Sequence, residues 1–174
     1  MAPKTIPEIV DLASAFYGSA VLFAALDLGV FKAIADQGGS AGRDVLADAL
    51  GASPRGLGLL LDACVAAGIL GKEGDAYFNT EAGKLALVPG APADLSKAIR
   101  YNQDVYPAWG RLAELARTGR PVERPELHLG DDPERTRRFA LAMRGRALAI
   151  GRSVVPMLDL SGCRRLLEDR KSVV

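Results

Sequence analysis

One short stretch of this sequence combines aromatic rings with amide and carboxyl groups: residues 101–109 read Tyr-Asn-Gln-Asp-Val-Tyr-Pro-Ala-Trp. Aromatic rings and a directed amide suit a flat phenolic ligand, through stacking and a hydrogen bond. The candidate ligand contacts are Tyr101, Asn102, Tyr106 and Trp109. The alternative is core packing with an amide on the helix surface, and packing is the favoured interpretation for Trp109.

Other side chains suited to chemistry are few. His128 is the single histidine, and a histidine can act as the base that deprotonates a hydroxyl. It lies in a proline-bearing loop with no orienting partner beside it, so we interpret it as a structural or solvated residue. Cys64 and Cys163 lie far apart without CxxC spacing. That pattern gives no metal site and is typical of a reducing cytosol.

Charge argues against nucleic acid as the main partner. The chain carries 22 Lys and Arg against 21 Asp and Glu, a net charge of +1. Residues 53–70 read as the second helix of a helix-turn-helix, and their only charged residues are Arg55 and Asp62. The surrounding block has three cations and five acids, a net charge of −2, whereas DNA phosphates attract lysines and arginines. The arginines of the last helix could form an anion site, but they scatter around the helix and alternate with Asp131, Asp132 and Glu134, so a solvated face is the favoured interpretation; they are Arg135, Arg137, Arg138, Arg144, Arg146 and Arg152.

The N-terminal region is apolar on both sides of its expected helix. Ile9, Leu12, Phe16, Ala20 and Phe23 recur at helical spacing, and the opposite face is apolar as well. One small domain covers one face, so we expect a second copy of the chain to cover the other. The predicted dimer contacts are Phe16, Val21, Leu22, Phe23, Leu26, Val30 and Phe31. The longest uncharged run, residues 12–26, is shorter than the roughly 20 residues that cross a bilayer, so no membrane partner is expected.

The first half of the chain predicts a mainly α fold, a winged helix-turn-helix with a small β-hairpin wing. After two N-terminal helices, Ser40 is expected to cap a helix over residues 41–50. Ser53 and Pro54 then begin the next helix, which ends near Gly68. Strands over 69–72 and 76–79 flank a Glu-Gly-Asp turn.

Long helices are expected in the second half. Thr80 caps a short helix, and a long helix follows over residues 95–118 with a kink at Pro107. Asp132 and Pro133 open the last helix, which carries Phe139 and Met143 on one side. After Pro156 a turn and the start of a β-strand are expected, without a second strand to pair with it.

Four of these patterns, in this order, resemble the N-terminal part of S-adenosylmethionine-dependent O-methyltransferases of the acetylserotonin (hydroxyindole) and caffeate type. Residues 19–31 look like the family's dimerisation helices, and residues 59–65 and 76–81 like its recognition helix and wing. Residues 151–160 resemble the helix and connector that enter the catalytic domain. The resemblance spans about residues 6–167 and implies an enzyme whose N-terminal domain forms an intertwined homodimer and roofs the substrate pocket.

The resemblance also implies a substrate and contacts to it. The reaction would transfer a methyl group to a hydroxyl of a small aromatic or polyketide-like molecule. In the caffeate-type enzymes an Asn-Gln-Asp run like residues 102–104 lies beside the aromatic substrate. Phe139 and Met143 match positions from which the last helix lines the pocket, although an apolar pair four residues apart is also typical of plain core.

The resemblance divides the chain at its connectors. We expect a winged-helix dimerisation domain over 1–90, a helical connector and substrate lid over 91–158, and the first strand of a Rossmann-like domain over 159–168. The family continues from this strand into a glycine-rich loop, but residues 169–174 read Asp-Arg-Lys-Ser-Val-Val. A common sequencing-adaptor string translates to the same six residues, so our hypothesis is that this tail is not native.

Taken together, the expectation is a cytoplasmic fragment that dimerises and holds half of a substrate pocket. The parent enzyme would use S-adenosylmethionine, whereas this fragment would bind none and would have no catalytic residues of its own. The alternative is a winged-helix regulator that binds DNA or a small ligand, and the acidic wing block argues against it.

Overall fold

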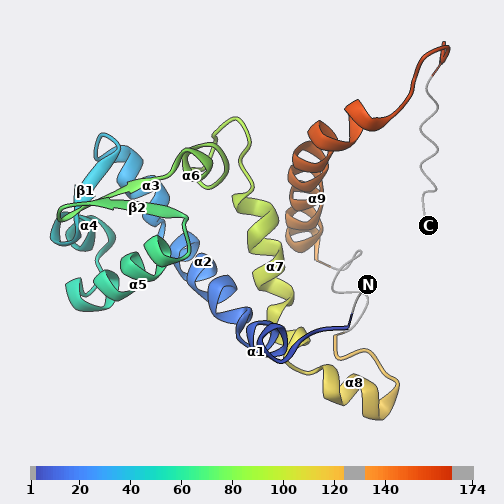
Figure 1. Ribbon diagram of the computed structural model, residues 1–174, viewed down its shortest axis with the longest axis horizontal. Coiled ribbons are helices and arrows are strands. Elements are labelled where there is room, and N and C mark those ends of the chain that lie inside the picture. The colour runs from blue at the N-terminus through green and yellow to red at the C-terminus, as the bar shows by residue number, and fades with distance from the viewer. Residues whose placement is uncertain (1–2, 124–131, 166–174) are drawn as a thin grey trace.

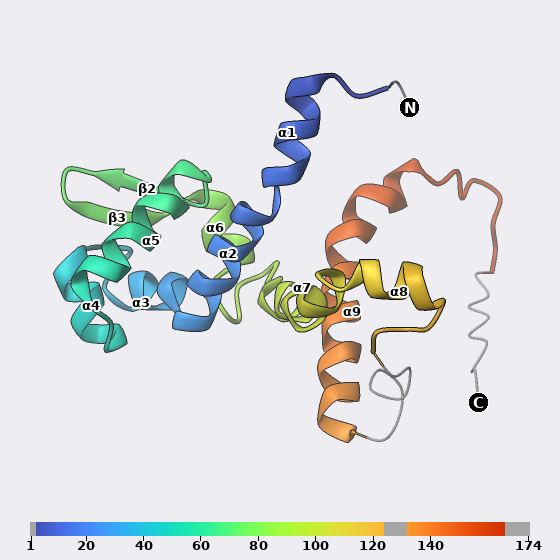
Figure 2. The same cartoon turned by 90° about the horizontal axis from the view of Figure 1, so that it is seen from below.

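The computed structural model describes residues 3–123 and 132–165. It is mainly helical, with one small antiparallel sheet (Figure 1). The sheet and its helices form a compact block at one side. The long helices of the second half lie beside this block, and the first helix projects away from it (Figure 2).

The N-terminal segment contains three helices, α1 (Ile6–Ser14), α2 (Phe16–Leu28) and α3 (Val30–Asp36). Thr5 caps α1 reciprocally with Glu8, whose carboxylate accepts hydrogen bonds from the Thr5 N–H and hydroxyl. Helix α2 ends at Gly29, whose φ of 79° is the left-handed conformation that favours glycine. The apolar run of the sequence is therefore divided between α1 and α2 at Ala15.

The third predicted helix begins later than its sequence signal indicated. Ser40 was expected to cap it, but Ser40 belongs to strand β1 (Ser40–Gly42), which pairs with β3. Helix α4 (Arg43–Leu50) therefore begins after Gly42. Backbone pairing with a strand almost forty residues away places Ser40 in extended conformation, and local capping preferences do not report such pairing.

The next helix and the hairpin agree with the sequence. Helix α5 (Pro54–Ala66) starts at Ser53, whose hydroxyl accepts a hydrogen bond from the Gly56 N–H. Strands β2 (Leu70–Glu73) and β3 (Ala76–Asn79) flank the predicted turn. The sheet order is β1-β3-β2, antiparallel throughout. Thr80 then caps α6 (Glu81–Ala86) by accepting from the Gly83 N–H, as predicted.

The core of the block lies between α2, α3, α4, α5 and the sheet. Its largest fully buried apolar side chains are Phe31, Ile34, Leu46, Leu61 and Val30. Asn79 is buried with them, and its side-chain amide donates to the Phe31 carbonyl at 2.9 Å. This bond joins β3 to α3 through the middle of the core.

The long helix predicted over 95–118 is two helices, α7 (Ser96–Trp109) and α8 (Leu112–Thr118). Pro107 lies inside α7, and the break comes at Gly110 and Arg111. Proline removes one backbone donor and glycine has low helix propensity, so together they end the helix rather than only kinking it. Helix α8 consequently turns away from α7 (Figures 1 and 2).

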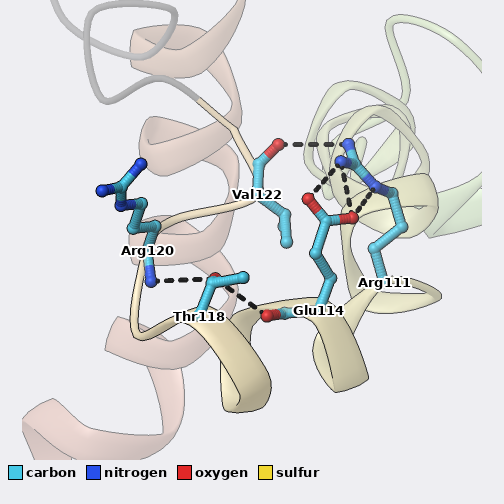
Figure 3. Close-up of polar contacts among 5 residues, drawn as sticks. All are labelled: Arg111, Glu114, Thr118, Arg120 and Val122. Carbon is cyan, nitrogen blue, oxygen red and sulfur yellow. Dashed lines mark hydrogen bonds and ion pairs between the residues drawn. The ribbon is translucent and has the colours of Figure 1, made fainter.

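Helix α8 and the chain that follows it are held by a small polar cluster (Figure 3). The Arg111 guanidinium contacts both carboxylate oxygens of Glu114 and donates to the Val122 carbonyl at 3.2 Å. Thr118 donates its hydroxyl to the Glu114 carbonyl and accepts from the Arg120 N–H. The cluster satisfies the Val122 carbonyl and folds residues 119–122 back toward Arg111 at the start of α8.

The last helix, α9 (Pro133–Val154), begins as predicted. The Asp132 carboxylate accepts hydrogen bonds from the Glu134 and Arg135 N–H groups. A short 3-10 turn (Val155–Met157) follows. Residues 158–165 then form a turn and irregular chain without a strand, so the strand expected after Pro156 is absent from them. Residues 166–168 and the tail 169–174 lie outside the described residues.

Candidate functional site

Helices α7 and α9 cross each other and pack closely, which brings several of the predicted ligand contacts together (Figures 1 and 2). Gly145 on α9 faces α7 at this contact: a Cβ added there would lie 3.7 Å from Ala98 and from the Asp94 carbonyl, an ordinary van der Waals distance. The rings of Tyr101 and Phe139 meet edge to face, with centroids 5.2 Å apart. Residues almost forty positions apart therefore form one aromatic pair at the helix interface.

The hydrogen-bond partner of the Asn102 side chain lies on α9. An Nη of Arg146 donates to the Asn102 side-chain oxygen at 3.0 Å. Met143, one turn before Arg146 on α9, is half-buried beside the same interface. Tyr101, Asn102, Phe139 and Met143 thus gather along α7 and α9.

Tyr106 and Trp109 lie farther along α7 and are more exposed. The Tyr106 ring packs against Phe23 of α2, with centroids 5.8 Å apart. Trp109 is 65% exposed at the end of α7, so the core packing favoured by its sequence context is wrong. Phe23 and Tyr106 were assigned to a dimer contact and to a ligand contact, and the structure places them side by side.

A broad groove of about 750 Å³ lies between α2 and α7 and contains this pair. Arg100 and Gln103 cross it, and both bind the carboxylate of Asp27. Arg100 also donates to the Leu26 carbonyl at 2.7 Å. These contacts fix α7 against α2 and so fix the aromatic and amide side chains of α7 relative to the block.

The predicted dimer contacts divide into exposed and buried residues. Phe16 is 46% exposed, and Val21, Leu22 and Phe23 are partly buried. Leu26, Val30 and Phe31 are at most 4% exposed because they pack in the core of their own chain. The expectation that these three contact a partner is therefore corrected: their side chains belong to the core.

The apolar surface instead extends toward the N-terminus. No residue of α1 is buried. Its exposed apolar side chains continue onto the start of α2: Ile6, Ile9, Val10, Leu12, Phe16 and Tyr17. The signal was present in the sequence as helical spacing on two faces, but the predicted contact set began only at Phe16. A contiguous apolar surface of this kind marks an interaction site.

By length and composition alone, the run Ile6–Leu28 is apolar enough to cross a membrane, with a mean hydropathy of 1.8. This differs from the expectation drawn from residues 12–26, because the run of 23 residues is longer than the roughly 20 that cross a bilayer. Core helices of soluble proteins and N-terminal signal segments share this length and composition.

A family model describes this part of the chain. The model of the O-methyltransferase dimerisation domain matches residues 10–89, from α1 to just after α6. Residues 10–89 are therefore similar to the dimerisation domains of O-methyltransferases. The match includes the exposed apolar surface of α1 and α2 together with the block, and it ends before α7.

Curated relatives extend the likeness beyond the dimerisation domain. The chain is 30% identical over 167 residues to the 3-hydroxy-5-methyl-1-naphthoate 3-O-methyltransferase of Streptomyces sahachiroi, covering 92% of this chain and 47% of that protein. It is 33% identical over 165 residues to the acetylserotonin O-methyltransferase of Homo sapiens, covering 87% of this chain and 48% of that protein. The chain therefore spans about half the length of these relatives.

A solved structure gives the same result for the fold. The structure of human N-acetylserotonin methyltransferase in complex with SAM matches with a TM-score of 0.75 and 30% identity. The match covers 92% of this chain and 50% of that chain, so it includes the dimerisation domain and the helices after it. An O-methyltransferase family protein from Burkholderia thailandensis, 23% identical with a TM-score of 0.74, shares the fold.

Within the dimerisation domain, the face formed by α4, α5 and the hairpin carries cations that are already engaged. Lys72 pairs with Asp62 at 2.9 Å and lies 4.7 Å from the centre of the Tyr77 ring. These neighbours, Tyr77 first and then Asp62, raise the pKa of Lys72. Arg43 pairs with Asp44. Two of the three cations of this face are therefore bound to carboxylates rather than free to meet phosphates.

Nucleophilic and metal-binding groups are scarce. Burial raises the pKa of the Cys64 thiol to about 11, so it stays protonated at neutral pH. Among residues 3–123 and 132–165, no three His, Cys, Asp or Glu side chains lie close enough to hold a metal ion. His128, the candidate base, lies outside the described residues.

Proposed function

We propose that this chain is the dimerisation and substrate-lid part of an S-adenosylmethionine-dependent O-methyltransferase. Its reaction would methylate a hydroxyl of a small aromatic or polyketide-like molecule. The observation that carries the proposal is the unpaired apolar surface of α1 and α2 within a dimerisation domain. The names of the relatives, which include a naphthoate methyltransferase and an acetylserotonin methyltransferase, support the reaction class.

The homodimer has a physical basis in side chains that have no cover within the single chain. Leu12 and Tyr17 are 63% and 62% exposed, and Phe16, next to Tyr17 on α2, is 46% exposed. Full burial of one such side chain contributes about 1.5–3 kcal/mol. In a twofold dimer, the same side chains of both copies are buried at the interface. This favours a second copy of the chain as the partner. In this proposal Phe16, Val21, Leu22 and Phe23 remain the interface residues of α2.

The substrate lid is proposed on α7 and α9. Tyr101 and Phe139 would present a ring edge and face to a planar substrate, and Met143 would add adaptable apolar contact. Asn102 would give the directed hydrogen bond. Tyr106 and Trp109, on the same face of α7 as Asn102 by helical spacing, would extend the surface toward α2.

The methyl donor would bind elsewhere in the parent enzyme. S-adenosylmethionine sites of this kind use a strand that leads into a glycine-rich turn and a helix. The strands of the described residues form one small antiparallel sheet joined by a hairpin and by α4 and α5, without such a turn. The described residues therefore do not fit the cofactor.

The same proposal assigns the parts of the chain. Residues 1–90 would be a winged-helix dimerisation domain, with β2 and β3 as the wing, and residues 91–158 the connector and lid. Residues 159–168 would begin a Rossmann-like domain, and 169–174 would be a non-native tail. Sequencing the genomic locus tests this: codons for a glycine-rich loop are expected after codon 168. Genomic codons for Asp-Arg-Lys-Ser-Val-Val and a stop would contradict it.

We further propose a cytoplasmic protein that binds neither nucleic acid nor membrane. A regulator that binds DNA remains the opposing function, and the engaged cations Arg43 and Lys72 count against it. Titration of duplex DNA at several salt concentrations separates the two. Salt-sensitive binding at micromolar protein would favour the regulator, and co-sedimentation with lipid vesicles would place α1 and α2 in a membrane instead.

The activity itself is tested on the complete reading frame. With S-adenosylmethionine and a panel of hydroxynaphthoate, N-acetylserotonin and simple naphthols, methyl transfer to at least one hydroxyl is expected. Asn102→Ala should lower kcat/KM about tenfold by removing one hydrogen bond to the substrate. Arg117→Ala, on the exposed surface of α8, is the matched control and should leave kcat/KM unchanged. Absence of methyl transfer across the panel, or equal losses in both variants, would contradict the proposal.

A further inference from the structure

The hydrogen bond between Arg146 and Asn102 also fixes the orientation of the Asn102 side-chain amide. A guanidinium has only donors, whereas an amide has an oxygen that accepts and a nitrogen that donates. Arg146 donates to the Asn102 oxygen at 3.0 Å. The amide oxygen of Asn102 must therefore face α9, and its NH2 group must point away from Arg146.

Arg146 differs from the other paired arginines of the second half in its electrostatic setting. Arg100, Arg111 and Arg135 each pair with a carboxylate: Asp27, Glu114 and Glu123 respectively. For Arg146 the described residues provide an amide oxygen and no carboxylate within 4 Å. The positive charge of Arg146 is thus not neutralised within this part of the chain.

Two apolar side chains of α9 lie near this pair, within a helix interface that also carries charged residues of α7 and α9. Met143 and Phe139 precede Arg146 on α9 by three and seven residues, so all three side chains share one helix face. The Phe139 ring contacts Tyr101 at 5.2 Å between centroids. A flat ring lying on this face would meet apolar surface, the NH2 group of Asn102 and the cation of Arg146 together.

We propose that Arg146 is a positioning and specificity residue of the lid. It orients the Asn102 amide so that the amide donates to the ligand, and its charge selects an aromatic ligand with an anionic oxygen, such as a carboxylate or an ionised hydroxyl. This inference rests on the proposed function, in which Asn102 faces the substrate. It adds the direction of the hydrogen bond between Asn102 and the ligand: Asn102 donates, and the ligand accepts.

The first test observes the orientation directly, without ligand. In nitrogen-15 NMR spectra of the 174-residue chain, the side-chain NH2 signals of Asn102 are compared between wild type and variants. Arg146→Met should shift and broaden them, because the amide is released. Arg146→Gln keeps a neutral donor and should preserve a single sharp pair. Arg144→Met is the matched control, since position 144 lies on the opposite side of α9 and is exposed.

The second test measures selectivity with three naphthalenes of similar shape. 2-Naphthoate carries an anionic acceptor, 2-acetylnaphthalene a neutral acceptor, and 2-ethylnaphthalene none. Wild type should bind them in that order of affinity in ligand-observed NMR titrations. Arg146→Met should weaken 2-naphthoate about tenfold and remove the ranking, as expected for loss of a charge-assisted contact. Arg146→Gln should keep the preference for acetyl over ethyl but lose the advantage of the carboxylate.

A fourth probe distinguishes the two sources of an anionic oxygen, a carboxylate and an ionised hydroxyl. 2-Naphthol at pH values below and above its ionisation reports whether an ionised hydroxyl is preferred as a carboxylate is. A rise in affinity on ionisation, in wild type but not in Arg146→Met, supports selection for any anionic oxygen. No rise, with 2-naphthoate still preferred, confines the selection to carboxylates and overturns the broader class.

Two failures are separable. If wild type binds none of the naphthalenes at millimolar concentration, the lid role on which this inference rests is overturned. If wild type binds them but Arg146→Met leaves both the ranking and the Asn102 signals unchanged, the inference alone is overturned and the lid role stands.

Discussion

The two halves of this chain are packed very differently. Between Ala25 and Leu87, fifteen residues form one buried apolar cluster closed by the sheet. In the described parts of α7, α8 and α9, the buried residues are Ser96, Ala98 and Ala142, all of them small. Helix α1, which projects away from the block, has none (Figure 2).

The comparison shows which parts need other contacts. A cluster that includes Phe31, Ile34 and Leu61 can stabilise the block alone, because each large side chain is removed from water. Helices α7 and α9 also pack against each other, through one aromatic pair and one hydrogen bond from Arg146 to Asn102, but none of their described large apolar side chains is buried. The proposed partner and substrate surfaces lie in these sparsely packed regions.

The largest expected effect is on the free energy of unfolding, and it should differ between the two halves. Phe31→Ala should lower the free energy of unfolding by about 3–5 kcal/mol, since it leaves a cavity in a closed core. Phe139→Ala should cost about 1 kcal/mol, mostly its ring contact with Tyr101. Urea unfolding followed by circular dichroism measures both. Equal costs would mean that α7 and α9 are packed as firmly as the block.

The next effect concerns the exposed apolar surface. Phe16→Asp should weaken self-association more than tenfold, because each copy loses about 1.5–3 kcal/mol of apolar burial. Leu59→Asp is the matched control: Leu59 is 68% exposed on α5, outside the proposed interface. Sedimentation equilibrium measures the association constant. If both variants associate as the wild type does, the interface lies elsewhere.

Loss of a helix cap in each half tests the same difference with a smaller effect. Thr80 and Asp132 each accept hydrogen bonds from the first turn of their helices, and loss of such a cap costs about 1 kcal/mol. Thr80→Ala should appear in global unfolding, because α6 belongs to the block. Asp132→Ala should instead speed hydrogen exchange in the first turns of α9. A change in global unfolding from both would show that the halves unfold together.

The smallest effect is at the junction between the halves. Burial, the largest influence, raises the pKa of Asp94, but hydrogen bonds from the Gly90 and Ser96 N–H groups together outweigh it and leave the pKa below its usual 3.8. A carboxyl whose pKa is lower when folded stabilises the protein above 3.8, and this contribution disappears as pH falls through the folded value. Asp94→Asn should therefore cost about 1 kcal/mol at neutral pH. The difference should vanish in acid, and a cost independent of pH would contradict this origin.

Local signals in the sequence predicted the elements that depend on local chemistry. Ser53, Thr80 and Asp132 cap their helices as expected, since a cap needs only residues within one turn. Strand β1 was missed, and Ser40 misassigned, because that strand exists only through pairing with Phe78 and its neighbours. The break of the long helix at Gly110 needed the combined effect of Pro107 and glycine.

The candidate site was predictable in its residues but not in its arrangement. The aromatic and amide side chains of α7 were identified by type, yet the contacts of Asn102 with Arg146 and of Tyr106 with Phe23 join distant segments. Apolar spacing located the apolar N-terminal segment, but it could not tell which of its side chains lie in the core and which lie on the surface. Phe31 and Phe16 look alike in sequence, and only packing places one in the core and the other on the surface.

The central claim is that the apolar surface of α1 and α2 pairs with a second copy of the chain. Light scattering on a size-exclusion column at micromolar concentration tests it most directly. The account predicts a particle of twice the 18.3 kDa chain mass. A soluble, monodisperse species of 18.3 kDa at that concentration would contradict it.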